Sequence, residues 1–314
     1  MKARNSRWSD EPKLDKSGKP VVITPVESDL KLFQLLLRYR YLPANFILPF
    51  TGFYHTYLKG RLDVLSRKPN KFLDRPDKQR SQPNANYRFL IYQLAYRGER
   101  ALKDAGLWTP EPQLGDKTLF AHSLMVTETI ASLELGCRSM IWWPEIAARL
   151  DNPQRFIPVE ISYRKEALAF DHYNDSNGPF GIRYPDNTAR FFSLEAEHTN
   201  QVDCKHLRKT SFLKKFLAVK AIMDTGAYKK AWGIPNLVTL VVTASQSRID
   251  TMKDLILRET NGKGLRYIAF YKIPVMENLE PAKPMPEMFT SGWQRAGHPD
   301  LYLNEPVERN AGRR

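Results

Sequence analysis

Cysteine is almost absent from this sequence, in which Cys137 and Cys204 are the only two among 314 residues. Two cysteines cannot build a disulfide framework, so a reducing, cytoplasmic compartment is expected. Cys204 lies between His198 and His206. Because no Cys-x-x-Cys pair accompanies these residues, a structural zinc site is not expected.

Long hydrophobic runs are also missing. The longest, such as residues 237–244, have the length of a strand, whereas a membrane helix needs about 18 apolar residues or more. No apolar segment of the signal-peptide type follows the first residue, so we expect no association with a membrane. The sequence also lacks a glycine-rich phosphate loop and a nucleophile elbow, which argues against a P-loop NTPase and a serine hydrolase.

Acidic residues are scarce in the first third of the chain. Residues 1–103 contain 21 Lys and Arg against 9 Asp and Glu, whereas residues 104–314 contain 27 against 25. The formal net charge of +14 is therefore concentrated in one region. An excess of this kind predicts binding to a polyanion, most often a nucleic acid.

The same region has the pattern of a winged helix-turn-helix. Residues 1–27 are polar and predict a flexible basic arm. Apolar spacing then predicts helices from Ser28 to Tyr41, from Ala44 to Phe50 and from about Phe53, and Gly52 supplies the turn between the last two. Strand-like residues 71–73 and 87–94 predict the wing, and residues 28–106 complete this domain.

The third helix and the wing supply the expected DNA contacts. The helix would present His55, Thr56, Lys59 and Arg61 to bases or phosphates, and the wing would present Arg75, Lys78, Arg80 and Arg88 to the backbone. The alternative is a winged helix that contacts protein, which usually lacks such a basic excess.

The second half of the chain predicts a mixed α/β or α+β domain. Pro110, Pro112 and Gly115 mark a linker over residues 107–118. Residues 119–272 alternate between helical and strand patterns, and residues 273–314 predict an irregular tail. The expected helices cover 119–135, 212–230 and 250–259, and the expected strands cover 156–163, 180–184, 189–197, 237–243 and 265–271.

Carboxylates concentrate around one of these strands. Alternation along residues 189–197 places Glu195 and Glu197 on one face, and the Pro185-Asp186 turn could bring the Asp186 carboxylate next to Glu195. Carboxylates that converge at a sheet edge form an oxygen site for Mg²⁺, with Asp186 and Glu195 as its ligands. The alternative is a solvated sheet face beside an ordinary turn.

This segment resembles the core of the PD-(D/E)xK nucleases, in which a helix with an acid precedes the two acidic strands and a further helix. The resemblance assigns these places to Glu128, Asp186 and the Glu195-Ala196-Glu197 strand. Glu197 stands where the family has lysine, and Lys215 on the next helix could replace that lysine. The catalytic set implied by this resemblance is Asp186, Glu195, Glu197 and Lys215.

A basic segment follows the carboxylates. Residues 205–230 contain eight Lys and Arg and a single acid, Asp224. A basic stripe beside a carboxylate cluster suits a metal-dependent phosphodiester site, because the stripe can hold the DNA backbone. A solvated lysine face is the alternative.

Taken in order, these pieces resemble the replication-relaxation family of plasmid and mobile-element proteins over roughly residues 28–272. The pieces are residues 35–42, Tyr92-Gln93-Leu94 with Gly98 and Leu102, His122-Ser123-Leu124 with Val126, Pro185-Asp186, Glu195-Ala196-Glu197, Lys215-Phe216, and Val241-Val242-Thr243 with Arg248. The family usually has Glu-x-Asp in its central strand. The resemblance implies DNA binding linked to replication or relaxation of plasmid DNA, with a restriction-endonuclease-like mixed-sheet domain after the winged helix.

Two functions follow from these observations. In the first, a DNA-binding protein of a plasmid, phage or integrated element selects a site and nicks or holds the DNA, with Mg²⁺ if it is active. In the second, the protein is a non-enzymatic regulator or replication adaptor whose second domain serves dimerisation or recruitment.

Double-stranded DNA is the expected partner, and a second copy of the chain and replication or mobilisation proteins are further candidates. RNA binding through the basic arm is a third interpretation. The distance between the Asp186 and Glu195 carboxylates separates the first two: if they lie too far apart to share an ion, the regulator is favoured.

Overall fold

A computed structural model describes residues 8–79, 89–109, 120–137, 139–197, 202–203, 206–274 and 282–306. The chain divides into two compact units. The first consists of Met1–Ala131 with Met276–Pro284, and the second of Ser132–Val275 with Met285–Arg314. The two units therefore alternate along the chain, and each consists of two segments.

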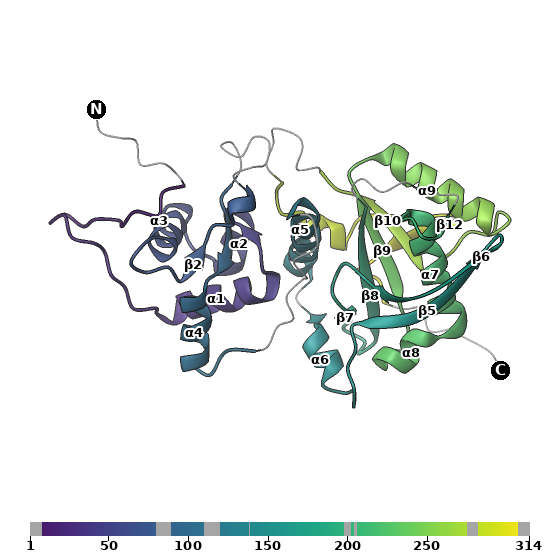
Figure 1. Cartoon of the computed structure of the whole chain (residues 1–314), viewed down its shortest axis with the longest axis horizontal. Coiled ribbons are helices and arrows are strands. Elements are labelled where there is room, and N and C mark those ends of the chain that lie inside the picture. The colour runs from purple at the N-terminus through teal and green to yellow at the C-terminus, as the bar shows by residue number, and fades with distance from the viewer. Residues whose placement is uncertain are drawn as a thin grey trace. The chain divides into compact units, whose positions relative to one another are not determined.

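The first unit consists of short helices around a small antiparallel sheet with the order β1-β3-β2 (Figure 1). Leu32, Phe33 and Leu36 are fully buried and hold the first helix on this core. Gly52 takes a left-handed conformation with φ of 65° and ends the second helix, as its position predicts. The elements are α1 (Glu27–Tyr39), β1 (Leu42–Pro43), α2 (Ala44–Thr51), α3 (His55–Ser66), β2 (Leu73–Asp74), η1 (Asp77–Gln79), β3 (Ile91–Leu94) and α4 (Tyr96–Asp104).

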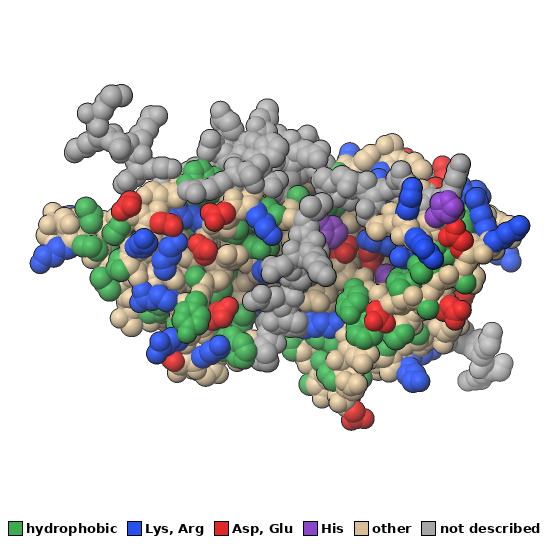
Figure 2. Space-filling view, in the orientation of Figure 1, with side chains coloured by type: hydrophobic (Ala, Val, Ile, Leu, Met, Phe, Trp, Pro, Cys, Tyr) green, Lys and Arg blue, Asp and Glu red, His purple; other side chains and the backbone are tan. Residues whose placement is uncertain are grey.

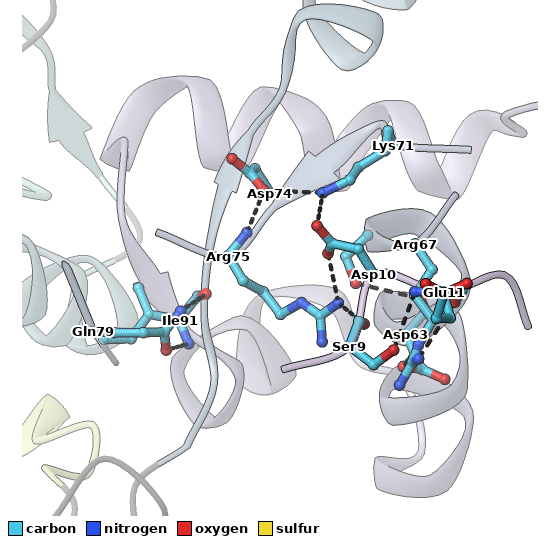
Figure 3. A network of polar contacts seen from close by, with 11 residues as sticks. Ser9, Asp10, Glu11, Asp63, Arg67, Lys71, Asp74, Arg75, Gln79 and Ile91 are labelled. Carbon is cyan, nitrogen blue, oxygen red and sulfur yellow. Dashed lines mark hydrogen bonds and ion pairs between the residues drawn. The ribbon is translucent and has the colours of Figure 1, made fainter. Parts of the chain in front are cut away.

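A buried glutamine closes one end of this small sheet. The Gln79 Nε2 atom donates to the Ile91 carbonyl, and the Ile91 N–H donates to Gln79 Oε1, both at 3.0 Å (Figure 3). The side chain thus takes the place of a neighbouring strand at Ile91. A buried amide with both groups paired fixes the short η1 turn on the sheet.

The N-terminal segment is not a free arm over residues 8–26, contrary to the sequence-based expectation. Asn70, which is 2% exposed, accepts a hydrogen bond from the Ile23 N–H and donates to the Val21 carbonyl. Arg75 donates to the Ser9 carbonyl at 2.6 Å, and Asp10 pairs with Lys71 at 3.0 Å (Figure 3). These backbone contacts cannot be read from composition, which shows only that the segment is polar.

The longest described helix, α5 (Phe120–Gly136), begins in the first unit. The Phe120 ring packs edge-on against Tyr41 with 5.2 Å between centroids. The first unit therefore extends beyond the boundary predicted at residues 107–118, of which 110–118 lie outside the described part of the chain. In the described ranges, no helix has both the length and the apolar character needed to cross a membrane.

The second unit is a mixed α/β structure with a seven-stranded sheet, as the alternating pattern predicts. The strand order is β12-β11-β10-β9-β8-β7-β4; β8, β9 and β10 are parallel and the other pairs are antiparallel. The elements are β4 (Met140–Ile141), α6 (Trp143–Ala147), β5 (Phe156–Tyr163), β6 (Glu166–Tyr173), β7 (Phe180–Arg183), β8 (Ala189–Glu197), α7 (Phe212–Thr225), α8 (Ala227–Trp232), β9 (Val238–Thr243), α9 (Gln246–Glu259), β10 (Ile268–Lys272), η3 (Pro286–Phe289), β11 (Gly292–Arg295) and β12 (His298–Tyr302).

Two crossover helices cover one face of the parallel strands. Helix α7 connects β8 to β9, and α9 connects β9 to β10 (Figure 1). Phe216 of α7, Met252 of α9 and Phe270 of β10 meet in one buried apolar cluster. Gly226, with φ of 66°, ends α7 and separates it from α8, so the predicted helix 212–230 is two helices.

A two-stranded hairpin, β5–β6, packs over α7 and α8. Ile157, Val159 and Ile161 point inward and share a cluster with Trp232. The alternation of buried and exposed residues along β5 matches the predicted strand. Strand β6 was not predicted, because its sequence gives a weaker alternation.

The predicted irregular tail contains a hairpin that completes the main sheet. Strand β11 pairs with β10, and β12 pairs with β11. Trp293 is fully buried, and Gly297 has φ of 70° in the turn between the strands. The prolines that suggested irregularity come before the hairpin, so the expectation was wrong for residues 286–302.

A buried ion pair in the first unit yields a test of this fold. Asp29 is 1% exposed, pairs with the Arg61 guanidinium through both carboxylate oxygens and accepts from the Val26 N–H. Asp29→Ala leaves the guanidinium without its partner and should lower the free energy of unfolding by about 3 kcal/mol or more. Urea denaturation measures this loss. Glu27→Ala, at an exposed pair with Lys31, is the control and should leave the midpoint unchanged; an unchanged midpoint for Asp29→Ala would show that the pair is dispensable.

Candidate functional site

Glu195, Glu197 and Lys215 meet where β8 ends beneath the first turn of α7. The Lys215 Nζ atom lies 2.6 Å from Glu195 Oε2 and 2.9 Å from Glu197 Oε1. Both glutamates are buried, with 2% and 0% exposure. The predicted alternation along β8 therefore describes their common face, and the structure brings the predicted lysine to it.

Asp175 is the third carboxylate of this cluster, and it was not among the predicted residues. It lies in the loop before β7, and its Oδ2 atom is 3.4 Å from Lys215 Nζ. The Asp175 N–H donates to the Leu194 carbonyl at 2.9 Å, and the Ala196 N–H donates to Asp175 Oδ2 at 2.7 Å. The loop thus continues the pairing of β7 with β8, which fixes the carboxylate beside Glu195.

Two further side chains border the carboxylates. The Arg248 Nη2 atom, from the first turn of α9, is 3.2 Å from Glu197 Oε2. The His172 Nε2 atom, from β6, is 3.6 Å from Glu195 Oε1. We use the name carboxylate cluster for Asp175, Glu195 and Glu197 together with Lys215, His172 and Arg248.

Burial dominates the protonation of the cluster. It raises the pKa of Glu195 to about 8 although Lys215 opposes the shift, and it lowers the pKa of His172 to about 4 with the help of the Lys215 charge. Burial alone would lower the pKa of Lys215, but Glu195, Asp175 and Glu197 outweigh it and raise that pKa well above its usual value. At neutral pH, His172 is uncharged and Lys215 is charged.

The donor atoms of the cluster are carboxylate oxygens, the type of ligand that a hard divalent cation prefers. Mg²⁺ prefers carboxylate oxygens, and neither oxygen of Glu195 nor Oε1 of Glu197 accepts a hydrogen bond from the described part of the chain. Glu195 Oε2 and Glu197 Oε1 instead form ion pairs with the Lys215 ammonium. Across the described ranges, however, no group of three or more His, Cys, Asp and Glu is placed so that it could hold an ion. The ammonium therefore stands among oxygens that a metal would use.

Asp186 lies elsewhere and does not join Glu195. It is exposed in the turn between β7 and β8, where its Oδ1 accepts from the Thr188 N–H at 2.9 Å and from the Thr188 hydroxyl. Strand β8 begins beside this turn and reaches Glu195 six residues after Ala189, which is about 20 Å at the usual rise of a strand. The local Pro-Asp motif thus closes a turn, and the expected Asp186 and Glu195 metal pair was wrong.

The other residues of the nuclease resemblance are more dispersed. Glu128 lies on the part of α5 that belongs to the first unit. Within the basic stripe, Lys214 stacks over Phe170 and Lys220 pairs with Asp224, so two of its lysines have partners inside the unit. His206 contacts Glu166 at 2.7 Å; His198 and Cys204 lie outside the described residues.

In the first unit, the beginning of α3 is the most exposed of the predicted DNA contacts. His55, Thr56 and Lys59 are all exposed there. Tyr54 and Tyr57 lie beside them with 87% and 50% exposure. These two tyrosines were not predicted, although two aromatic residues flanking His55 and Thr56 were a visible signal. No acidic residue lies between positions 51 and 62.

The remaining predicted DNA contacts fall into two groups. Arg61 and Arg75 are held inside the unit. Arg61 pairs with Asp29. Arg75 contacts the Ser9 carbonyl and Asp10 (Figure 3). Lys78 is exposed on η1, and Arg80 and Arg88 lie outside the described residues. On the face shown in Figure 2, Lys and Arg side chains of the first unit are interspersed with Asp and Glu. Part of the basic excess is thus neutralised within the fold.

No protein-family model, no curated protein and no solved structure matches this chain. What the site can do therefore follows from its geometry and chemistry alone.

His172 makes the stability of the second unit depend on pH. Its pKa in the folded protein, about 4, is below the ordinary 6.5, so the unfolded chain binds more protons between these values. The stability that this histidine contributes is present above 6.5 and is lost as the pH falls toward 4. From about pH 7 to about pH 5, wild type should lose about 2 kcal/mol more than His172→Gln.

Denaturant unfolding at a series of pH values measures this difference. His206→Gln is the control, because the His206 side chain is 65% exposed, and it should follow wild type. A His172→Gln curve parallel to that of wild type would contradict the assignment of a neutral buried histidine.

Proposed function

We propose that this chain is a DNA-binding protein of a plasmid or other mobile element, acting in DNA replication or relaxation and nicking DNA with a divalent metal. The observation that carries the proposal is the meeting of Asp175, Glu195, Glu197 and Lys215 at the end of β8. Three carboxyl groups and a lysine at one sheet edge are the groups that metal-dependent phosphodiester cleavage uses.

The order of elements around the cluster supports the nuclease-like interpretation. Strands β7 and β8 are antiparallel, α7 follows, and β9 returns parallel to β8. This is the order expected from the PD-(D/E)xK resemblance, with Asp175 before β7 as the first acid in place of Asp186. The Glu195-Ala196-Glu197 strand keeps its expected position, and the lysine comes from α7.

Each residue has a task in this proposal. The described arrangement, with Lys215 among the three carboxyl groups, is not placed to hold an ion. If the ammonium left that space, Asp175, Glu195 and Glu197 would hold Mg²⁺, which supplies charge for the scissile phosphate and an activated water when bound. Lys215 would orient the phosphate, because its side chain is 19% exposed and can reach solvent. Arg248 would hold Glu197 in place through their 3.2 Å contact.

DNA recognition would rest on the first unit. The order α1, β1, α2, α3, β2, β3 is that of a winged helix. The exposed beginning of α3 offers Lys59 to phosphates and His55 and Thr56 to base edges. Tyr54 and Tyr57 would add apolar contacts at the same surface.

The second candidate is a non-enzymatic regulator or replication adaptor. Two observations favour it. Asp186 and Glu195 lie at opposite ends of β8, too far apart to share an ion, so the enzymatic proposal depends on Asp175 in place of Asp186. In addition, the Lys215 ammonium occupies the space among the carboxylates. This candidate predicts DNA retention that does not depend on metal.

Nicking of supercoiled plasmid tests the enzymatic proposal. Wild type should convert plasmid to open circles with Mg²⁺ or Mn²⁺, and Asp175→Asn or Glu195→Gln should lower the rate by about 100-fold or more, because each removes a metal ligand. Asp186→Asn is the matched control. It changes an acid in the turn at the other end of β8 and should nick as wild type does.

Gel analysis of open-circular and linear products measures these rates. No nicking by wild type with either metal overturns the enzymatic proposal and leaves the regulator. Equal nicking by wild type and Glu195→Gln would assign the activity to another site or a contaminant.

A second experiment tests the DNA-binding surface. Lys59→Ala should weaken binding to duplex DNA and reduce the slope of log affinity against log salt by about one, because one phosphate contact is lost. Its unfolding midpoint should not change, since Lys59 is exposed. Lys68→Ala, an exposed lysine beyond the other end of α3, should bind as wild type does. Equal losses for both variants would indicate a general basic surface instead of recognition through α3.

A further inference from the structure

The Lys215 ammonium lies where a cation shared by the carboxylate cluster would lie. Its Nζ atom is 2.6 Å from Glu195, 2.9 Å from Glu197 and 3.4 Å from Asp175. A lysine ammonium is a compact positive charge, so one ammonium can form ionic contacts with three carboxyl groups at once. The three distances show that it does so here.

The cluster opens to solvent on the side of Lys215. The Lys215 and Asp175 side chains are 19% and 18% exposed, whereas those of Glu195 and Glu197 are 3% and 0% exposed. Of these four side chains, those of Lys215 and Asp175 are therefore the ones that reach solvent.

The buried oxygens depend on the ammonium. Both oxygens of Glu195 and Oε1 of Glu197 accept no hydrogen bond from the described residues. By contrast, Asp175 Oδ2 accepts from the Ala196 N–H, and Glu197 Oε2 contacts Arg248. Carboxyl oxygens buried without hydrogen-bond donors are costly unless a cation compensates them.

Lysine can leave such a position more readily than arginine could. Its charge is compact and sits on a flexible four-carbon stem, and Lys215 belongs to the first turn of α7, at the solvent side of the cluster. Rotation of the side chain can remove the ammonium without a change in the helix. The three carboxyl groups would then face a space suited to a hard cation.

We propose that Lys215 is an internal substitute for the divalent cation, occupying the carboxylate cluster in the metal-free protein and being displaced when the metal binds. This inference rests on the proposed function, because the same carboxyl groups are its metal ligands. It makes Lys215 a competitor of the metal in addition to a contact for the phosphate. In the metal-free protein, the ammonium compensates the buried carboxyl groups. A metal ion must displace it to bind, and this lowers the affinity of the cluster for the metal.

Binding of Mn²⁺ alone to the full chain tests the competition. Calorimetry or electron paramagnetic resonance should show that Lys215→Met binds Mn²⁺ about tenfold or more tightly than wild type. Lys220→Met is the matched control, because Lys220 lies on the same helix and pairs with the exposed Asp224. It should bind Mn²⁺ as wild type does. Equal affinity in Lys215→Met and wild type overturns the proposal.

Thermal unfolding gives a second readout. Without metal, Lys215→Met should melt below wild type, because buried carboxyl groups lose their cation. Mg²⁺ should raise its Tm by about 5 °C or more and that of wild type by much less, whereas NaCl of equal ionic strength should not restore it. Equal Mg²⁺ shifts in the two proteins would overturn the proposal.

A second pair of variants covers the case in which Lys215→Met does not fold. Asp175→Asn removes one carboxylate and keeps the oxygen that accepts from Ala196, and adding Lys215→Met removes the ammonium together with that charge. The double variant should bind Mn²⁺ more tightly than Asp175→Asn alone, which still contains the competing lysine. If it does not, the lysine is not a competitor.

These outcomes can be separated from those of the nicking assay. Tighter Mn²⁺ binding by Lys215→Met with no nicking by wild type would remove the enzymatic function and retain the cation exchange. Nicking by wild type with unchanged Mn²⁺ affinity in Lys215→Met would remove the exchange alone.

Discussion

The contact between the Lys215 ammonium and three carboxyl groups is the constraint on which the second unit depends. It joins three segments: the loop before β7, the end of β8 and the first turn of α7. Buried acids on a central strand require a counter-charge, and β8 has neighbours on both sides. An apolar cluster joins α7, α9 and the parallel strands, and the ammonium connects the first turn of α7 to Glu195.

The sequence predicts those residues of the site that lie on one strand or on the helix that follows it. It does not predict the residue that reaches the site from another segment of the chain. Alternation along β8 places Glu195 and Glu197 on one face, and the basic helix that follows makes Lys215 a reasonable partner. Asp175 could not be found in this way. Residues 174–178 read as a turn, and the carboxylate reaches the cluster only because Asp175 pairs with Leu194, which is distant in the sequence. The Pro185-Asp186 pair is the stronger local motif, but it closes a hairpin.

Composition was a weaker guide than pattern. The first third of the chain has an excess of basic residues, as counted. Arg61 and Arg75, however, have acidic or carbonyl partners within the fold, and a count of charges cannot show this. The helices of the first unit and the parallel strands of the second follow from apolar spacing. The segment before residue 27 and the hairpin after residue 290 depend on contacts with distant residues, such as those of Asn70 and Trp293.

The alternation of the two units along the chain has a consequence for synthesis of the protein. The Asn45 side chain donates to the carbonyl of Ala282 at 2.6 Å, across 237 positions of sequence. A chain emerging from the ribosome must therefore be made past Ala282, and so through the segment Ser132–Val275 of the second unit, before this contact can form. Both units are therefore completed late in synthesis: the first needs its segment Met276–Pro284, and the main sheet of the second needs β11 and β12, which follow that segment.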